Sequence, residues 1–176
     1  MTAGLIDAPS LREVLGSIRY GRALADHPLT ALAIVGARLA ADGLVDAPES
    51  RDWALASVLE TVVRDHLARA RGHVEVPAAP TLDDEWRWLA EDFAADSVER
   101  QAWSLVYHRF IAEVGLPMGQ IATRVASDRR TLVRRLHHGV QALAHALQQA
   151  EIAAARGATA DGGADHGADG ATPPLG

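Results

Sequence analysis

Apolar residues recur along this chain at spacings of three and four, the period of a helix that buries one face. The pattern predicts an all-α fold, a multi-helix bundle in which Trp53 and Ala90 lie on buried helix faces. Helices are predicted at residues 9–25, 26–41, 50–71, from 82 onward, 98–114, 117–125 and from 129 onward.

Short polar residues mark the expected helix starts. Ser10, Asp26 and Ser97 are placed to accept a backbone N–H from the first turn of the helix that follows. Thr81 begins a stretch with the spacing of a capping box. His27 stands beside one of these caps, where a local hydrogen bond is a better explanation than catalysis.

Composition divides the chain into four segments. Residues 1–72 form an N-terminal three-helix segment, and residues 73–81 form a Pro-rich connector. Residues 82–152 form a second helical domain that contains the motif described below. Residues 153–176 are rich in Gly, Ala and Asp, with too little apolar surface to offset the entropy of ordering, so they are predicted to be a disordered tail.

The most informative stretch runs from residue 116 to residue 143, and it predicts two helices joined by a tight turn. The first helix covers 117–125, the turn covers 126–128, and Ser127 or Asp128 is placed to cap the second helix. A short helix, a turn and a second helix with basic residues at its start form a helix-turn-helix. The apolar stripe of the second helix is Leu132, Leu136, Val140, Leu143 and Leu147.

This stretch resembles the helix-turn-helix of region 4 of sigma-70-type factors and of response-regulator output domains. With the preceding helix the resemblance covers residues 98–150. Residues 82–150 are also similar to helical modules of multidomain bacterial signalling proteins, where Tyr-x-Arg-aromatic precedes the same turn, here 107–110. The motif departs from the family at Ala126, Ser127 and Val133, where Gly, an apolar residue and a polar residue are usual. The matching positions are Ile121-Ala122, Asp128, Thr131-Leu132, Arg135-Leu136-His137, Gly139 and Ala142-Leu143.

Charge is distributed unevenly. The net charge is −6, and residues 1–116 hold 11 Arg against 18 acidic residues, whereas residues 117–150 hold five Arg and one Asp. A basic island in an acidic chain is typical of a local DNA-contacting surface. The alternative is that these arginines only solvate two helices. Lys is absent, and the preference for Arg and Ala is typical of a GC-rich bacterial genome.

The first functional hypothesis is a DNA-binding transcriptional regulator whose second helix enters the major groove of double-stranded DNA. Homodimerisation through residues 1–72, or docking on RNA polymerase as the resemblance implies, would add affinity. Arg129, Arg130 and Arg134 are the candidates for base or phosphate contacts, and Gln120, Thr131 and His137 are the candidates for phosphate contacts.

The second hypothesis is a protein-protein interaction module of a signalling system that keeps the fold without binding DNA. An enzyme is not expected, because the chain lacks a Gly-rich phosphate loop, a Gly-x-Ser-x-Gly motif, a His-Glu-x-x-His motif and any Cys. No cofactor or metal is expected, and the adjacent His137 and His138 diverge by about 100° on a helix. Neither a membrane span nor a signal peptide is predicted, which leaves the cytoplasm as the default location.

Overall fold

The computed structural model describes residues 6–24, 27–73, 75–76 and 81–161. Within these residues all regular structure is helical and no strand forms, so the predicted all-α class is confirmed. The elements are α1 (Ala8–Arg19), the 3₁₀-helix η1 (Pro28–Ala31), α2 (Ala33–Ala41), α3 (Pro48–Arg71), α4 (Leu82–Ala94), α5 (Val98–Val106), the π-helix η2 (Tyr107–Ile111), α6 (Met118–Arg124) and α7 (Arg129–Asp161).

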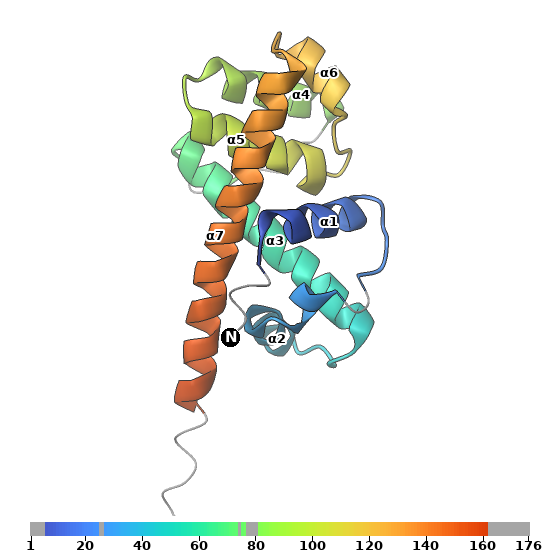
Figure 1. The fold of residues 1–176 in the computed structure, drawn as a ribbon, viewed down its shortest axis with the longest axis vertical. Coiled ribbons are helices and arrows are strands. Elements are labelled where there is room, and N and C mark those ends of the chain that lie inside the picture. Colours follow the sequence, from blue (N-terminus) through green and yellow to red (C-terminus); the bar gives the residue numbers. More distant parts are fainter. Residues whose placement is uncertain (1–5, 25–26, 74, 77–80, 162–176) are drawn as a thin grey trace, which may run out of the picture.

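The long helix α7 is the central element of the fold, and most of the other helices pack along it (Figure 1). Its 33 residues extend about 50 Å at 1.5 Å per residue. Helices α1, α2, α3, α5 and α6 all pack against it, and α5 makes the most extensive contact. Four of the five residues of the predicted inner stripe, Leu132, Val140, Leu143 and Leu147, have no exposed surface, and Leu136 is half-buried. One helix therefore links the turn after α6 to both halves of the chain.

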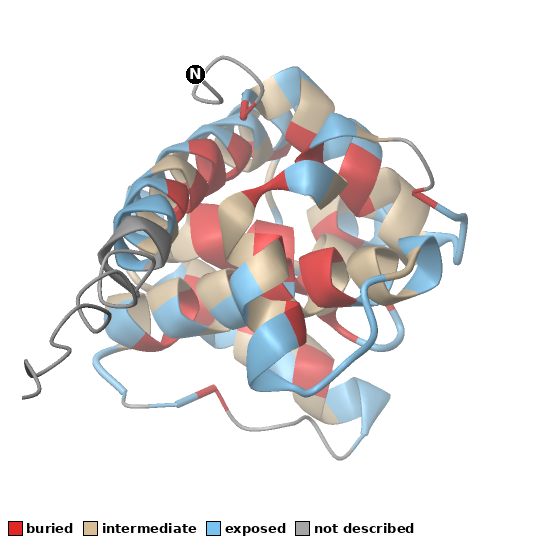
Figure 2. Ribbon diagram, turned by 90° about the horizontal axis from the view of Figure 1, so that it is seen from below, coloured by how far each residue is buried: buried red, intermediate tan, exposed pale blue. Residues whose placement is uncertain are grey.

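Two apolar cores form around this helix. The smaller one joins α4, α5, α6 and α7 through Leu89, Leu105, Ile121 and Leu132. The larger one combines side chains of α1, α2 and α3 with side chains of α5 and α7. Figure 2 shows the buried positions facing one another across the helices, with exposed positions on the outside. The proposed division into residues 1–72 and 82–152 stays a prediction, but side chains of both segments share the larger core.

Several helix starts agree with the sequence and others do not. Thr81 and Ser97 cap α4 and α5 as predicted. Asp7, rather than Ser10, caps α1 by accepting the N–H of Ser10 at 2.8 Å. The predicted cap Asp26 lies outside the described residues, and His27 caps the next turn by accepting the N–H of Leu29 at 3.2 Å. The local role expected for His27 is therefore confirmed.

The first two predicted helices are too long. The helix predicted for 9–25 ends at Arg19, and Gly21 follows with a φ of +60°. The helix predicted for 26–41 is divided into η1 and α2, because Leu32 is in an extended conformation with ψ of 146°. In both cases the helical spacing of apolar residues continues past a residue whose backbone conformation is not helical.

Two residues expected to be inward lie outside. The side chain of Trp53 is 49% exposed, and Ala90 is also exposed. Arg38 lies over the Trp53 ring at 5.7 Å from its centroid, so the indole packs against an arginine at the surface. The helical spacing of apolar residues identifies the apolar face of a helix. It does not show whether another helix packs against every residue of that face.

The predictions for 98–114 and for the tail also need correction. The α-helix ends at Val106 and continues as the π-helix η2, after which Gly115 has a φ of +55°. Arg19 donates to the carbonyls of Arg109 and Gly115, which fixes this turn against α1. At the other end α7 continues through residue 161, so the predicted start of the tail at 153 is wrong. Residues 162–176 lie outside the described part of the chain.

Candidate nucleic-acid interface

The turn between α6 and α7 has a defined hydrogen-bond pattern. Val125 ends α6, and Ala126 adopts a left-handed conformation with a φ of +48°. The N–H of Ser127 donates to the carbonyl of Ala122 at 3.2 Å, which is the closing bond of a Schellman motif. Gly adopts a positive φ without steric cost, so Ala126 occupies a backbone position that favours Gly.

Asp128 starts α7. Its carboxylate accepts the N–H of Thr131 at 2.9 Å, as the sequence predicts for a cap at this position. Hydrogen bonding to Thr131 lowers the pKa of Asp128, and Arg134 lowers it further. The cap fixes the direction in which the first turn of α7 leaves the α6–α7 turn.

The structure places most of the candidate residues at the surface. Gln120, Arg129, Arg130 and Arg134 are exposed, whereas Thr131 is half-buried beside the cap. Arg130 and Arg134 are four residues apart and lie on one face of the helix. In the described part of the chain, Arg129, Arg130 and Arg134 make no side-chain hydrogen bond or ion pair with another residue. Their guanidinium groups are therefore available to a ligand.

The other two arginines of the basic island have partners within the fold. Arg135 donates from Nε to the side-chain oxygen of Gln101 on α5 at 3.2 Å. Arg124 lies over the Trp86 ring with its guanidinium carbon 5.7 Å from the centroid. These two residues help to hold α7 and α6 in place, so only three of the five arginines remain as contact candidates.

His137 differs from the other candidates because it lies against α1. Its Nδ1 is 3.3 Å from a guanidinium nitrogen of Arg12, and both residues line a shallow hollow with Glu13. Arg12 could not be predicted as a neighbour of His137 from the sequence, since 125 residues separate the two. The packing of α1 thus brings a further arginine to the edge of the candidate surface.

A close crossing with α5 supports α7 behind this surface. A Cβ atom at Gly139 would lie 2.6 Å from the carbonyl oxygen of Ala102 and 2.8 Å from a methyl carbon of Val106. Any larger residue at 139 would force the helices apart. The absence of a side chain here lets α7 rest directly on the backbone of α5.

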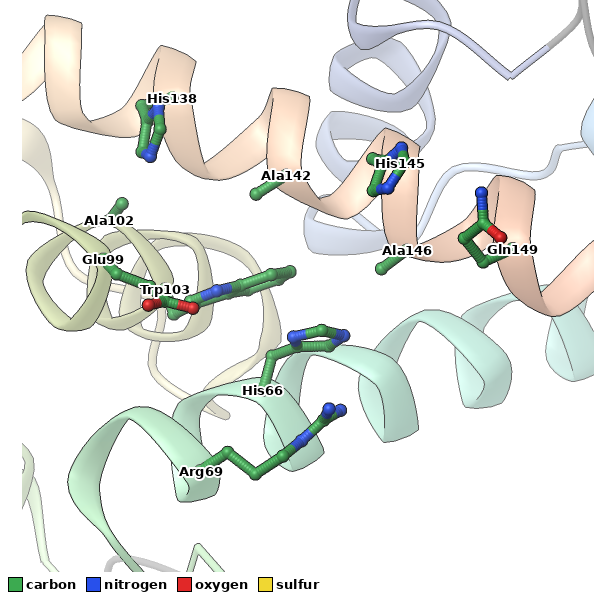
Figure 3. A pocket seen from close by; sticks show the side chains of 10 residues that line it. All are labelled: His66, Arg69, Glu99, Ala102, Trp103, His138, Ala142, His145, Ala146 and Gln149. Carbon is green, nitrogen blue, oxygen red and sulfur yellow. The ribbon is translucent and has the colours of Figure 1, made fainter.

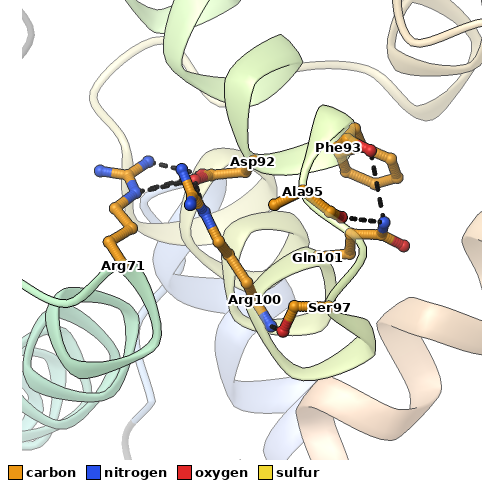
Figure 4. A network of polar contacts seen from close by, with 7 residues as sticks. All are labelled: Arg71, Asp92, Phe93, Ala95, Ser97, Arg100 and Gln101. Atoms are coloured by element: carbon orange, nitrogen blue, oxygen red, sulfur yellow. Dashed lines mark hydrogen bonds and ion pairs between the residues drawn. The ribbon is translucent and has the colours of Figure 1, made fainter.

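A buried ion-pair network fixes α4 and α5 relative to α3 (Figure 4). Asp92 has no exposed surface and accepts hydrogen bonds from Arg71 at 2.6 Å and from Arg100 at 2.7 Å. Burial raises the pKa of Asp92, but the hydrogen bonds from Arg71 and its other partners outweigh this effect and lower it overall. The carboxylate is therefore charged at neutral pH and pairs with both arginines, which leaves one of their two positive charges uncompensated.

Comparison with known proteins gives no match to a protein-family model, to a curated protein or to a solved structure. The resemblance of residues 98–150 to region 4 therefore stays a prediction. No helix of the described residues has the length and apolar character needed to cross a bilayer. The same residues contain no group of three or more His, Cys, Asp or Glu side chains placed to bind a metal ion.

Proposed function

We propose that this chain is a DNA-binding transcriptional regulator that contacts duplex DNA with the first two turns of α7. The observation that carries the proposal is the group of three exposed arginines, Arg129, Arg130 and Arg134, whose side chains form no hydrogen bond or ion pair within the described structure. They follow a short helix and a capped turn, as expected of a recognition helix.

Electrostatics supports a local rather than a general affinity for nucleic acid. The chain carries a net charge of −6, so its overall field repels phosphates. Contact is therefore favourable only where cations are concentrated and have no carboxylate partner. Gln120 on α6 and the Arg12–His137 pair border the surface and are placed to add phosphate contacts at its margins.

The test is a fluorescence-anisotropy titration with random duplex DNA at low and moderate salt. The variant Arg129→Ala/Arg130→Ala/Arg134→Ala should bind much more weakly, so that its affinity is measurable only at low salt, while its helical circular dichroism stays unchanged. If each arginine contacts one phosphate, the slope of log K against log salt should fall in magnitude by about 2.7, at about 0.9 per contact.

The matched control removes three arginines from elsewhere on the surface, Arg22, Arg38 and Arg87. It changes the net charge by the same amount, and it should retain most of the affinity. DNA binding that survives the α7 triple change, or that falls equally in the control, would refute the proposed surface.

A second candidate function is a protein interaction module that uses the same surface. Val133 favours it, because this side chain is 52% exposed beside the arginines where the family usually has a polar residue. A folded protein that does not bind random duplex DNA even at low salt would favour this candidate. Val133→Ser should leave DNA affinity unchanged if the first proposal is correct.

A further inference from the structure

The exposed face of α7 that carries Arg130 and Arg134 continues to His137, where α1 packs beside it. Residues 130, 134 and 137 are spaced by four and three, so their side chains follow one another along one face of the helix. His137 is exposed, and its Nδ1 lies 3.3 Å from a guanidinium nitrogen of Arg12. Arg12 therefore extends the basic face of α7 onto a helix from the other end of the chain.

The contact between Arg12 and His137 assigns a role to each nitrogen of the imidazole. A guanidinium has five N–H donors and no acceptor, so the Nδ1 of His137 is the acceptor of this hydrogen bond. The imidazole that makes this contact is neutral and carries its proton on Nε2. Protonation of Nδ1 removes the hydrogen bond, because the ring then presents a donor and a positive charge to the guanidinium.

The two side chains line a shallow hollow of about 410 Å³ whose lining residues all come from α1 and α7. Glu13 provides the one carboxylate among these residues, and it forms no ion pair with Arg12 or with any other described residue. Apart from their mutual contact, the donors of Arg12 and the Nε2 of His137 have no hydrogen-bond partner in the described part of the chain. Donors from two helices thus meet at one place without an anion.

The other charged groups near the pair do not supply that anion. The carboxylate of Asp7, just before α1, accepts the N–H of Ser10 at 2.8 Å and is used as the helix cap. On α7, Arg134 lies one turn before His137 and adds positive charge, and the uncharged Gln141 lies one turn after it. An anionic group from outside the chain is therefore the partner that fits this pair.

Given the proposed contact with duplex DNA, on which this inference rests, we propose that Arg12 and His137 together bind one phosphodiester of the DNA backbone, and that His137 takes up a proton when they do. With a phosphate between them, the guanidinium and the imidazolium both donate to an anion instead of facing each other. The complex then holds one proton more than the free protein, so DNA affinity should rise as the pH falls. In this arrangement α1 is part of the DNA-binding surface.

The test is an anisotropy titration of the full chain with random duplex DNA at constant ionic strength and at pH 6, 7 and 8, the range in which histidine side chains change charge. The wild type should bind about fivefold more tightly at pH 6 than at pH 8, within the limit of tenfold per pH unit that uptake of one proton allows. Calorimetry in two buffers of different ionisation enthalpy should show that protons are taken up on binding at pH 7.

His137→Gln keeps a hydrogen-bonding side chain that cannot become charged. Its affinities at pH 6 and pH 8 should be nearly equal, and most of the proton uptake should be lost. His138→Gln is the matched control, because this exposed neighbour on α7 lines a different hollow, the groove formed at Trp103 by α3, α5 and α7 (Figure 3). The control should keep both the gain in affinity at pH 6 and the proton uptake.

Arg12→Gln tests the other half of the pair. It should weaken binding at all three pH values and lower the magnitude of the slope of log K against log salt by about 0.9, as expected for the loss of one phosphate contact. Arg22→Gln removes the same charge from an exposed position beyond the end of α1 and should leave this slope unchanged. Circular dichroism should be the same for all four variants and the wild type.

The possible failures are distinguishable. No DNA binding by the wild type at any of these pH values, even at low salt, would refute the DNA-binding function together with the phosphate contact of Arg12 and His137. DNA binding with an affinity that does not change between pH 6 and pH 8 would overturn only the proton-linked contact. A gain at pH 6 that persists in His137→Gln, or that His138→Gln loses equally, would overturn it as well.

Discussion

Two groups of arginines in this molecule have the same chemistry and opposite surroundings. Arg71 and Arg100 converge on Asp92, where the side chains of Arg71 and Asp92 are 8% and 1% exposed. Arg129, Arg130 and Arg134 lie at the exposed start of α7, and their side chains form no hydrogen bond or ion pair in the described structure. Both groups look alike in the sequence, and only the fold distinguishes the arginines that hold helices together from those available for binding.

The difference follows from the cost of removing charge from water. A buried guanidinium without a counter-ion is strongly unfavourable, so Arg71 requires Asp92. An exposed guanidinium keeps its hydration and needs no partner. The first group is therefore expected to govern stability with little direct effect on binding, and the second group to govern binding with little effect on stability.

The largest expected effect comes from Asp92→Asn. The substitution leaves two arginines at one site without their counter-ion, and loss of one partner of a buried pair costs about 3–5 kcal/mol of unfolding free energy. Urea denaturation at pH 7 measures it. Glu60→Gln is the matched control, because it breaks the exposed pair with Arg64 and should cost about 0.5 kcal/mol or less. Equal effects of the two substitutions would show that burial does not set the energetic role of these ion pairs.

The next largest effect is expected at His108, which is buried close to the Arg71–Asp92 pair. It has no exposed surface, neither ring nitrogen has a hydrogen-bond partner, and burial together with Arg71 lowers its pKa to about 4. Well above the ordinary histidine pKa of 6.5, the folded and unfolded states are both neutral at this residue. As the pH falls toward 4, the unfolded state gains a proton that the folded state does not bind, so stability falls by about 3 kcal/mol.

The measurement is the free energy of unfolding between pH 7 and pH 4. His108→Leu should flatten most of this dependence. A smaller slope of the same sign should remain, because the pKa of His66 is also lowered by burial. An unchanged slope in the variant would show that His108 is not the main titrating group.

The buried charge of Glu151 is satisfied in a different way from that of Asp92. Glu151 of α7 is 6% exposed, and its carboxylate oxygens accept the N–H groups of Ala33 and Ile34, each at 3.0 Å. Leu32 precedes α2 and provides no side-chain cap, so Glu151, which is 118 positions from Ala33, performs this role. The negative charge also complements the positive end of the α2 dipole.

Glu151→Gln should cost about 1–2 kcal/mol, since the amide keeps at most one acceptor oxygen and loses the charge. Thermal or urea unfolding provides the measurement, with the exposed Glu91→Gln as control. A cost below that of the control would mean that an uncharged acceptor caps α2 equally well, and the comparison of buried charges would then be limited to Asp92.

The residues that the sequence predicted correctly act over short distances along the chain. Thr81, Ser97 and Asp128 each bond a group three residues away, so spacing is sufficient to identify them. The stripe from Leu132 to Leu147 follows from the helix period. Glu151 and the Arg12–His137 contact could not be predicted in this way, because their partners come from distant helices. The groove at Trp103 was missed for the same reason, since three helices form it.

The smallest expected effect provides the sharpest test of the comparison, because its sign is informative. Arg129 and Arg130 occupy the first positions of α7, where the positive end of the helix dipole disfavours cations by about 0.3–1 kcal/mol each. If these arginines serve only binding, Arg129→Ala/Arg130→Ala should raise the free energy of unfolding by about 0.5 kcal/mol. Urea denaturation at low salt measures this change. The gain in stability should become smaller as salt is added, because salt screens the helix dipole. A loss of stability would instead assign them a structural role like that of Arg71. Arginines retained where they destabilise their own helix would be consistent with selection for binding rather than for folding.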